Sequence, residues 1–353
     1  MAPVPWFPSE NPAFGRYAKY AKVPCAEQRH GIEVLHPRYP LIPKIGMTLT
    51  PFTLVLSCLS PLKRLIQSGY DFDLIDAHYF YPDGVAAVLL GKLLKKPVVI
   101  TARGSDINVI PKYRLPRKMI QWAANHAAHL ITVSAALKTS LSGLGVPPEK
   151  ITVLRNGVDT NLFHPTAREE MRRLLGVSGP LLLSVGNLVP LKGHDLVIKA
   201  LQQLEGMQLI LIGDGPEKEV LQQLSRSLDV AHRTRFLDNL TQMDLARYYS
   251  AADALILASS REGWANVLLE SMACGTPVIA TPVGGNPEIV AAPAAGRILT
   301  ERTADAIARS VRELTQSDAD RHQTRKIACS FGWEEINLGQ KTVFKLILST
   351  RRN

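Results

Sequence analysis

The sequence predicts an α/β protein of two domains, each built on a doubly wound parallel sheet. Short apolar runs typical of buried parallel strands alternate with segments typical of helices, which implies right-handed crossovers. This alternation occurs in two series, separated by a Phe-His-Pro linker and a charged run within residues 163–173. The chain has 353 residues, which exceeds the size at which a single hydrophobic core keeps growing.

The first series lacks a clear opening strand. Pro3, Pro5 and Pro8 would leave gaps in the hydrogen bonding of a central strand, so nothing before Trp6 is expected to serve as one. Residues 32–35 indicate only a weak strand. We therefore expect that the first strand of this domain is missing from the sequence, through a late start codon or a truncation. Regular strands are expected at 74–78, 97–102, 130–134 and 151–154, with helices at 84–94 and 119–128.

The second series is regular, and each of its strands ends in a glycine or a polar residue. Strands are expected at 181–185, 208–212, 235–237, 254–258 and 277–280. An amphipathic helix is expected over 333–348. We expect a first domain over 1–164, a second over 165–332, and a C-terminal helix within 333–353 that packs back on the first domain. Ligands of such sheets bind at the carboxyl ends of the strands, and we expect those ends to face a common cleft.

Composition and charge limit the classes of function. The four cysteines are isolated, which favours free thiols in a reducing compartment. No signal-peptide pattern opens the chain, so a cytoplasmic location is expected. Residues 1–165 hold 19 Lys and Arg against 10 Asp and Glu, which is a net charge of +9 out of +10 for the whole chain. A basic half can face nucleic acid, anionic lipid or a phosphorylated acceptor. No nucleic-acid-binding motif is present, so no nucleic-acid partner is expected.

One apolar segment of the first half bears on membrane binding. Residues 45–62 carry no charge but contain Pro51 and Pro61, which makes the segment too short and too interrupted to span a bilayer. Lys44, Lys63 and Arg64 flank it. Docking on an anionic membrane surface and burial of residues 54–62 as an ordinary core helix both remain open.

Two glutamates of the second half bracket a helix start. Glu262 follows the strand expected at 254–258, and Glu270 lies inside a helix that begins near Ala265 or Asn266 and stops at residues 275–277. If the backbone between them were fully helical, the two carboxylates would be about 12 Å apart along the axis. The free amides of residues 263–267 would then lie at the positive end of a helix, where an anion binds well. The alternative is one capping and one solvated glutamate.

Several motifs of the second half occur in a recognisable order. They are Val-Gly-Asn-Leu-Val-Pro-Leu-Lys-Gly at 185–193, Ile-Gly-Asp-Gly-Pro at 212–216, the 262–270 stretch with Ala-Cys-Gly-Thr-Pro at 273–277, and Gly-Gly-Asn-Pro-Glu at 284–288. In this order they resemble family-four retaining glycosyltransferases of the GT-B fold, and residues 155–165 resemble the interdomain segment of that family. The likeness runs from about residue 70 and is strongest over 150–290. Asn187 and the opening residues 7–12 resemble enzymes of cell-wall or secreted polysaccharides, of the teichuronic-acid type.

The resemblance implies a donor site in the second domain. Glu270 would bind the ribose of a nucleotide and Glu262 the transferred sugar, while Lys192 would stabilise the charge that develops on the diphosphate leaving group. Asn187 stands where the family usually has a second cation. The other donor-binding candidates are Gly186, Gly213, Asp214, Asn239, Gly263, Trp264, Ala265, Asn266 and Val267. The alternative for Lys192 is an ordinary exposed lysine at a helix start.

The resemblance also implies an acceptor site in the first domain. Arg103 stands where many members have histidine, and it could hold an acceptor phosphate or donate to the leaving group, or only pair with Asp106. His78 ends a strand and could replace that histidine, or it could be an ordinary strand-end histidine whose hydrogen bonds are satisfied. Gly15 is the only candidate for the glycine loop that approaches the diphosphate. The acceptor candidates are therefore Gly15, His78 and Asp106, with Arg103 as a catalytic candidate beside Glu262 and Lys192.

The function expected from this is retaining transfer of a sugar from a nucleotide sugar to a glycan or lipid-linked acceptor. No Asp-x-Asp metal motif is evident, so neither a metal nor another cofactor is expected. Two alternatives remain: a degenerate relative that binds the nucleotide sugar without transfer, and another enzyme of the same fold, such as a nucleotide-sugar epimerase or a glycan phosphorylase. The expected location is the cytoplasm, with the inner face of a membrane as a possible docking surface.

Overall fold

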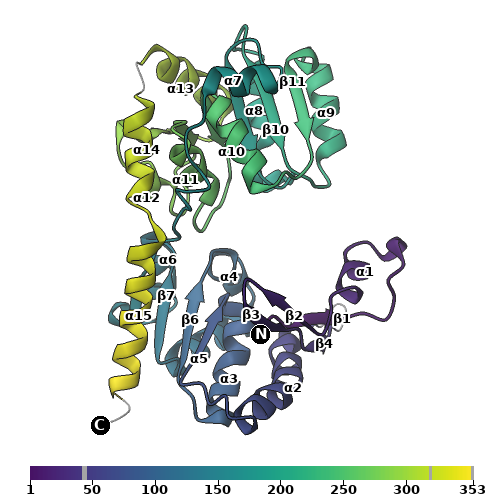
Figure 1. Ribbon diagram of the computed structural model, residues 1–353, viewed down its shortest axis with the longest axis vertical. Coiled ribbons are helices and arrows are strands. Elements are labelled where there is room, and N and C mark those ends of the chain that lie inside the picture. Colours follow the sequence, from purple (N-terminus) through teal and green to yellow (C-terminus); the bar gives the residue numbers. More distant parts are fainter. Residues whose placement is uncertain (42–45, 318–319, 351–353) are drawn as a thin grey trace. The chain divides into compact units, whose positions relative to one another are not determined.

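The computed structural model describes residues 1–41, 46–317 and 320–350, and its contacts divide the chain into two units (Figure 1). The first unit holds Met1–Thr132, Leu137–Val153 and the segment from Lys341 onward, and the second holds Val133–Ala136 and Leu154–Gln340. Each unit is built on a parallel sheet with helices, which confirms the predicted α/β class.

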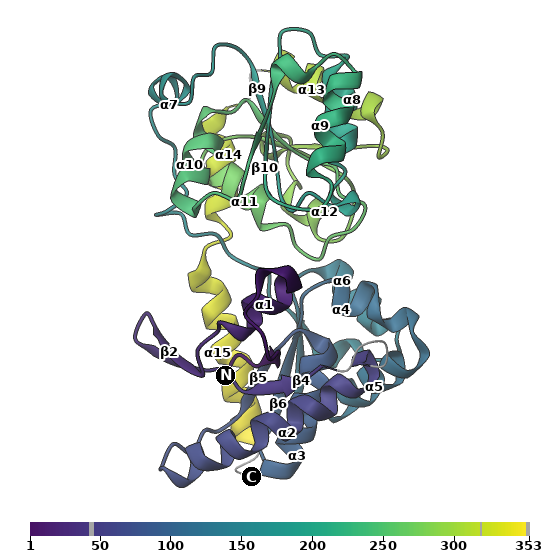
Figure 2. The ribbon, with the colours of Figure 1, turned by 90° about the vertical axis from the view of Figure 1, so that its right-hand side faces the viewer.

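The main sheet of the first unit has four parallel strands in the order β5 (Ile75–His78), β6 (Val98–Ala102), β7 (His129–Thr132) and β8 (Ile151–Val153). All five residues of β6 are buried, as its largely apolar sequence predicts. The associated helices are α2 (Gly46–Gln67), α3 (Val85–Leu94), α4 (Ser105–Asn108), α5 (Arg114–His126) and α6 (Ala135–Ser142). Figure 2 shows α2, α3 and α5 packed side by side.

As the prolines predicted, no segment before Trp6 joins the main sheet, but a short strand does form there. Strand β1 (Val4–Trp6) pairs in parallel with β4 (Arg38–Pro40). The pair forms a separate two-stranded sheet, so Pro5 lies on an edge strand, where a missing backbone donor is tolerated. Helix α1 (Arg16–Ala21) and the antiparallel hairpin of β2 (Ala26–Arg29) and β3 (Ile32–Leu35) lie in the same N-terminal segment.

Strand β5 is therefore the edge of the main sheet, because β1 does not join it. No strand pairs with the outer side of β5 in the described parts of the chain. A cavity of about 550 Å³ borders β5, with Met1, Leu54, Phe72 and Leu90 among its lining residues. This cavity lies beside the sheet edge where the sequence lacked an opening strand.

The second unit has six parallel strands in the order β11-β10-β9-β12-β13-β14. Their bounds are β9 (Leu181–Val185), β10 (Gln208–Ile212), β11 (Thr234–Leu237), β12 (Ala254–Leu257), β13 (Val278–Ala280) and β14 (Gly296–Ile298). Of these six strands, the sequence did not predict β14, because it has three residues, of which one is glycine and one is charged. The hydrophobic core of the second unit includes Leu182, Leu209 and Ile256.

Helices cover both faces of this sheet (Figure 2). Helix α8 (His194–Leu201) packs between α9 (Lys218–Ser227) and α13 (Ala304–Gln316) on one face. The other face carries α7 (Arg168–Leu174), α10 (Gln242–Ala251), α11 (Asn266–Ala273) and α14 (Arg321–Cys329). The short α12 (Asn286–Ile289) follows β13, and the last helix, α15 (Trp333–Thr350), corresponds to the predicted tail helix.

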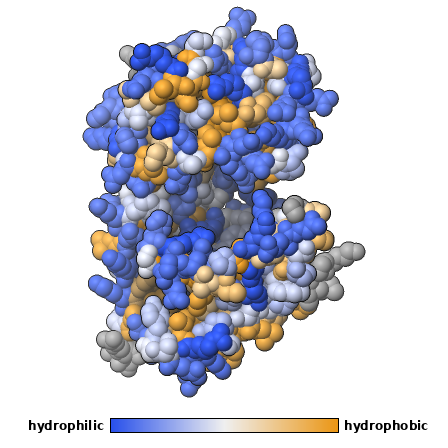
Figure 3. Space-filling view, turned by 45° about the vertical axis from the view of Figure 1, so that its right-hand side comes forward, coloured by the Kyte–Doolittle hydropathy of each residue, from blue (hydrophilic) through white to orange (hydrophobic). Residues whose placement is uncertain are grey.

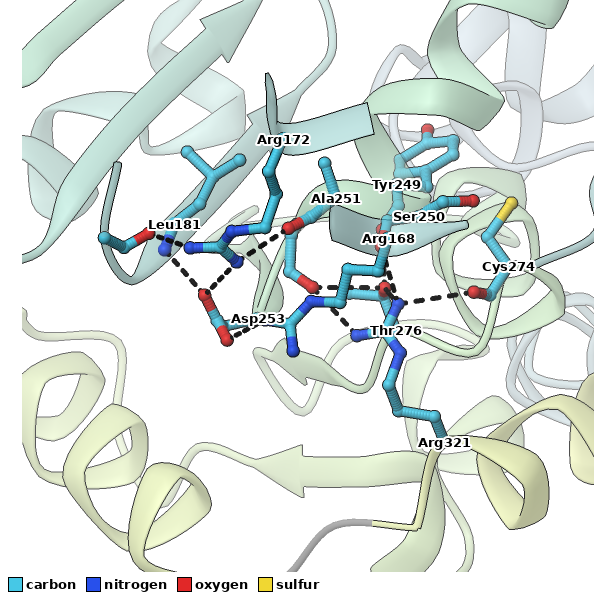
Figure 4. Close-up of polar contacts among 12 residues, drawn as sticks. Arg168, Arg172, Leu181, Tyr249, Ser250, Ala251, Asp253, Cys274, Thr276 and Arg321 are labelled. Carbon is cyan, nitrogen blue, oxygen red and sulfur yellow. Dashed lines mark hydrogen bonds and ion pairs between the residues drawn. The ribbon is translucent and has the colours of Figure 1, made fainter. Parts of the chain in front are cut away.

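A half-buried polar cluster joins α7 and α14 to the amino ends of the strands (Figure 4). Asp253, directly before β12, accepts hydrogen bonds from the backbone amide of Leu181 at 2.7 Å and from the guanidinium groups of Arg168 and Arg172. Arg321 donates to the carbonyls of Ala252, Ser250 and Cys274. Because this cluster lies at the amino ends of the strands, we assign it to stability.

Candidate functional site

The strand order of the second unit marks one position for a ligand. The chain runs from β9 outward to β10 and β11, then returns to β12 on the other side of β9 and continues to β13. The loops after β9 and β12 therefore leave in opposite directions at the carboxyl edge of the sheet. Ligands of open parallel sheets bind at such a reversal of strand order.

Lys192 and Glu262 meet at this reversal. Lys192 lies on the loop after β9, and Glu262 lies on the loop after β12. The Lys192 Nζ is 2.7 Å from the Glu262 Oε1, and the hydroxyl of Ser259 donates to the same oxygen at 2.6 Å. The two side chains are only 21% and 12% exposed, so the ion pair is largely shielded from water. The sequence predicted both residues, but not their direct contact.

The N-terminus of α11 presents free backbone amides beside this pair. Ala265 is the N-cap, with φ −92° and ψ 91°, and its side chain caps nothing. The amides of residues 263–267 have no acceptor in the described parts of the chain. The segment from Glu262 to Ala265 is not helical, so the 12 Å separation calculated for a continuous helix does not apply. The expected anion-binding helix start is nevertheless present.

The side chain of Trp264 is not available to a ligand. It is only 7% exposed and packs against Phe331, with ring centroids 5.8 Å apart. Any contribution of Trp264 to donor binding thus comes from its backbone. The side chain of Asn266, in contrast, is exposed, and its Oδ1 accepts a hydrogen bond from Asn156 at 3.1 Å.

Glu270 lies one turn inside α11 and is partly buried. The hydroxyl of Tyr249, which is fully buried, donates to the Glu270 Oε2 at 3.0 Å. Burial raises the pKa of the Glu270 carboxyl, and the hydrogen bond from Tyr249 lowers it in part. Tyr249 therefore holds one oxygen in place, and the Oε1 has no hydrogen-bond partner in the described parts of the chain.

Glycines allow the loops of this edge to approach one another. A Cβ on Gly213 would lie 2.0 Å from the carbonyl oxygen of Gly186, and one on Gly215 would lie 2.4 Å from that of Leu188. On the other side of the reversal, a Cβ on Gly284 would lie 2.2 Å from the carbonyl oxygen of Glu262. Side chains at these positions would therefore push the loops apart.

The loop from residue 186 to 193 is supported by a histidine that sequence reasoning missed. His194 is 2% exposed, and its Nδ1 lies 2.9 Å from the hydroxyl of Ser184. Its Nε2 donates to the carbonyl of Asn187 at 3.3 Å. Burial lowers the pKa of His194 to about 4, so the ring is neutral at neutral pH. The side chain of Asn187 is exposed.

The remaining donor candidates lie on loops at the same edge. Asp214, after β10, is exposed, and its carboxylate accepts from the amide of Gly215 at 2.8 Å. Asn239 is exposed after β11, the strand farthest from β12 on this side. Asp214 is thus one strand from β9, and Asn239 is two.

In the first unit, His78 and Arg103 lie together at the carboxyl ends of β5 and β6. The Arg103 Nη2 donates to the His78 Nδ1 at 2.6 Å, and the His78 Nε2 is 3.2 Å from the Asp76 Oδ2. A guanidinium can only donate, so Nδ1 is the acceptor and the ring proton on Nε2 points to Asp76. Sequence reasoning missed Asp76, although its position two residues before His78 places it on the same side of the strand.

One of the other two acceptor candidates, Asp106, does not fit its expected role. Asp106 is fully buried, and it accepts hydrogen bonds from the amides of Phe80 and Gly104 at 2.7 Å each and from the amide of Arg103. It holds the loop after β6 and does not present its carboxylate to an acceptor, nor does it pair with the Arg103 guanidinium. Gly15, with φ 54°, precedes α1 in the N-terminal segment, where a Cβ would have open space around it. Its approach to a diphosphate remains a prediction.

Glu288, which lies in the last of the sequence motifs, links α12 to two other segments of the second unit. It accepts two hydrogen bonds from Arg155, at 3.0 and 2.7 Å, and one from the amide of Ala135 at 2.8 Å. All three residues belong to the second unit. The predicted interdomain segment thereby contacts α12 through Arg155 and α11 through Asn156.

Comparison with known proteins agrees with this arrangement. Residues 167–330 match the family described as glycosyl transferases group 1, and residues 16–162 match glycosyltransferase family 4. A Bacillus subtilis glycosyltransferase assigned to teichuronic acid biosynthesis is 32% identical over 278 residues, which cover 76% of this chain and 68% of that protein. The chain belongs to glycosyltransferase family 4.

Other relatives in this group are matched over less of their length. The D-inositol 3-phosphate glycosyltransferase of Mycobacterium marinum is 32% identical over 219 residues, which cover 58% of this chain and 46% of that protein. The N-acetyl-alpha-D-glucosaminyl L-malate synthase of Bacillus anthracis is 28% identical, with 64% of its length matched. The chain thus spans about half to two thirds of these two proteins.

Solved structures confirm the GT-B fold of this family-4 chain. Sucrose-phosphate synthase from Thermosynechococcus elongatus superimposes with a TM-score of 0.79 at 21% identity, covering 94% of this chain and 87% of that one. Anabaena Alr3699/HepE, solved in complex with UDP, gives a TM-score of 0.75 at 23% identity, covering 88% and 86% of the two chains. At these identities the likeness establishes the fold alone.

The family-4 chain shows no preassembled metal site in its described residues, where no three His, Cys, Asp or Glu side chains lie together suitably. Metal-independent activity remains a prediction.

Arg302 is a further basic residue that sequence reasoning missed. It lies after β14 and donates to the carbonyl of Ala258, at the end of β12, at 2.7 Å.

Proposed function

We propose that this protein transfers a sugar from a nucleoside diphosphate sugar to a glycan or lipid-linked acceptor, with retention of anomeric configuration. The observation that carries the proposal is the Lys192–Glu262 ion pair beside the free amides of α11, at the reversal of strand order. The pair combines a cation for a diphosphate with a carboxylate for sugar hydroxyls. Family membership makes glycosyl transfer the reaction that uses such a pair.

In this proposal the second unit binds the donor. The amides at the start of α11 and the ammonium group of Lys192 hold the diphosphate and stabilise the charge that grows on it as the sugar leaves. Glu262 accepts hydrogen bonds from sugar hydroxyls, and the Oε1 of Glu270 accepts from ribose hydroxyls. UDP bound to Anabaena HepE, a protein of the same fold, supports a nucleotide as the ligand.

The first unit binds the acceptor in this proposal. Arg103 and His78 form a polar surface at the ends of β5 and β6, with Asp76 orienting the imidazole. Arg103 would donate to an acceptor phosphate or to the leaving group, and His78 would orient the attacking hydroxyl. The relative assigned to teichuronic acid biosynthesis supports a cell-wall or secreted polysaccharide as the product. We place the protein in the cytoplasm, at the inner face of a membrane.

A screen of nucleotide sugars tests the proposal directly. UDP-, GDP- and ADP-sugars are added one at a time, and a true donor raises the thermal midpoint, because only a ligand of the folded state stabilises it. Release of the nucleoside diphosphate in the presence of an acceptor extract then measures transfer. Retention is read from the anomeric configuration of the product by NMR. No midpoint shift with any nucleotide sugar would overturn the proposed donor site.

The alternative of a non-catalytic relative predicts a different outcome. A binder without activity shows the midpoint shift but releases no nucleoside diphosphate with any acceptor. The open edge of β5 favours this alternative, because the described residues place no strand beside β5, where an opening strand of the main sheet was expected. The same assay with and without EDTA tests metal independence, and activity that requires added Mg²⁺ would contradict it.

A further inference from the structure

We propose that α2, α3 and α5 of the first unit form a docking face for an anionic lipid bilayer. This face, called the basic apolar face, consists of the exposed side chains of these helices. Its apolar residues are Leu49, Phe52, Leu56, Leu93 and Leu115, and its cations are Lys63, Arg64, Lys92, Arg114, Arg117 and Lys118. The inference extends the proposed function, because it names the surface on which a lipid-linked acceptor would be met.

Helix α2 is apolar on the side that faces water. Leu54 and Cys58 are 3% and 5% exposed and pack on the unit, as a core helix requires. The opposite side shows Leu49, Phe52 and Leu56, the last of which is 76% exposed. These three residues are spaced three and four apart and therefore form one stripe along the helix. Figure 3 shows apolar residues of this kind at the surface of the first unit.

The stripe continues into a groove formed with α3 and α5. The groove has a volume of about 290 Å³ and is lined by Phe52 and Leu115 together with Val85, Leu89, Met119 and Trp122. Its remaining lining residue is Lys118, which places a cation at an otherwise apolar depression. Lys92 lies above the ring of Trp122, at 4.8 Å from its centroid. Apolar and cationic groups are thus mixed on one continuous surface.

The charge of these helices selects the partner. None of α2, α3 and α5 contains an aspartate or a glutamate. Lysine and arginine beside exposed apolar side chains are the composition of helices that lie in the interface of an anionic membrane. A second copy of the chain would bring two positively charged faces together, which is unfavourable.

The helix is placed to lie on a bilayer, not to cross it. Contrary to the expectation from the two prolines, residues Met47–Gln67 form one helix that is long and apolar enough to span a bilayer, and only 28% of its most apolar stretch of 18 residues is buried. However, the hydroxyl of Tyr81 donates to the carbonyl of Met47, and Leu54 packs on the unit. Spanning would break these contacts, whereas a surface position keeps them and covers the exposed stripe.

Vesicle co-sedimentation of the full chain tests the inference. We expect the protein to sediment with vesicles that contain phosphatidylglycerol, and about tenfold less with phosphatidylcholine alone. Leu56→Glu and Lys118→Glu should each weaken binding about tenfold. Leu174→Glu is the matched control, because Leu174 is 70% exposed on α7 of the second unit and lies outside the face. It should bind as the unmodified protein does.

Three results would overturn the inference: no sedimentation with anionic vesicles, equal loss in the control variant, or self-association that Leu56→Glu abolishes. Resistance of bound protein to extraction by high salt and carbonate would instead indicate a spanning helix and overturn the surface position. Thermal midpoints of all variants confirm that they fold. Because the assay contains no nucleotide, its failure leaves the donor site untouched, and failure of the donor screen leaves vesicle binding untouched.

Discussion

The most informative prediction concerns the Lys192–Glu262 ion pair, because removing the charge of Lys192 should weaken nucleotide binding and removing the charge of Glu262 should strengthen it. In the free protein the ammonium is held by Glu262 at 2.7 Å. A diphosphate must therefore compete with this carboxylate for Lys192. Lys192→Met removes the cation, while Glu262→Gln keeps the shape of the side chain, frees Lys192 and leaves an oxygen for the Ser259 hydroxyl.

The structure sets the magnitudes. At an effective dielectric constant of about 20, charges 2.7 Å apart attract by about 6 kcal/mol before the cost of desolvation is subtracted. The side chains are 21% and 12% exposed, so loss of one partner should lower the free energy of unfolding by about 1 to 3 kcal/mol. Loss of a charge-assisted hydrogen bond to phosphate should weaken nucleoside diphosphate binding about 10- to 100-fold in Lys192→Met. Turnover should fall by about 10² to 10³.

Glu262→Gln should behave differently. Removing the competing charge should tighten binding of the nucleoside diphosphate by about threefold to tenfold. Turnover should nevertheless fall, since the carboxylate proposed for the sugar hydroxyls is gone. Titration calorimetry with UDP, GDP and ADP measures the affinities, and urea denaturation measures stability.

Two outcomes would refute this reasoning. If Lys192→Met leaves the affinity for every nucleoside diphosphate unchanged, Lys192 does not meet the phosphates. If both variants weaken binding equally, the ion pair only stabilises the conformation of the two loops, and Lys192 does not leave Glu262 to bind the diphosphate.

Three further predictions concern stability. Burial raises the pKa of Glu270 above 4.5, so the native carboxyl keeps its proton to higher pH than the unfolded chain does, and stability falls as pH rises through the native pKa. Glu270→Gln should therefore raise the thermal midpoint at about pH 7.5 but not at about pH 4, while weakening nucleotide binding; an unchanged affinity by calorimetry would remove its ribose role. Burial raises the pKa of Asp83 from 3.8 to about 6, which corresponds to about 3 kcal/mol between its two protonation states. Asp83→Asn should thus increase the free energy of unfolding by up to about 3 kcal/mol above pH 6 and leave it unchanged below about pH 4. A gain in stability that is independent of pH would contradict the raised pKa of Asp83. Asp253→Asn weakens the hydrogen bonds to Arg172 and the Leu181 amide, so urea denaturation should show a loss of about 1 to 3 kcal/mol with no change in nucleotide affinity; altered affinity would show that the cluster reaches the site.

The sequence by itself determined the fold class and most strands of both sheets. Parallel strands are buried on both faces, so they appear as apolar runs such as Ala254–Leu257, and the polar residues after each run mark the carboxyl edge. The order of motifs in the second half indicated the family in the same way. These signals are local, because each depends on residues adjacent in the chain.

Only the tertiary structure decided which of these residues meet. Lys192 and Glu262 are separated by 70 positions, and strand order alone brings them within 2.7 Å. The structure also shows that Asp106 and the Trp264 ring are buried and cannot reach a ligand. The sequence could not predict this, because the exposure of a side chain depends on packing between distant segments. Strand β1 pairs with β4 for the same reason: no local pattern tells a strand which partner it will find. Which residues lie at the carboxyl edge follows from the local pattern, but which of them touch follows from the order of the strands.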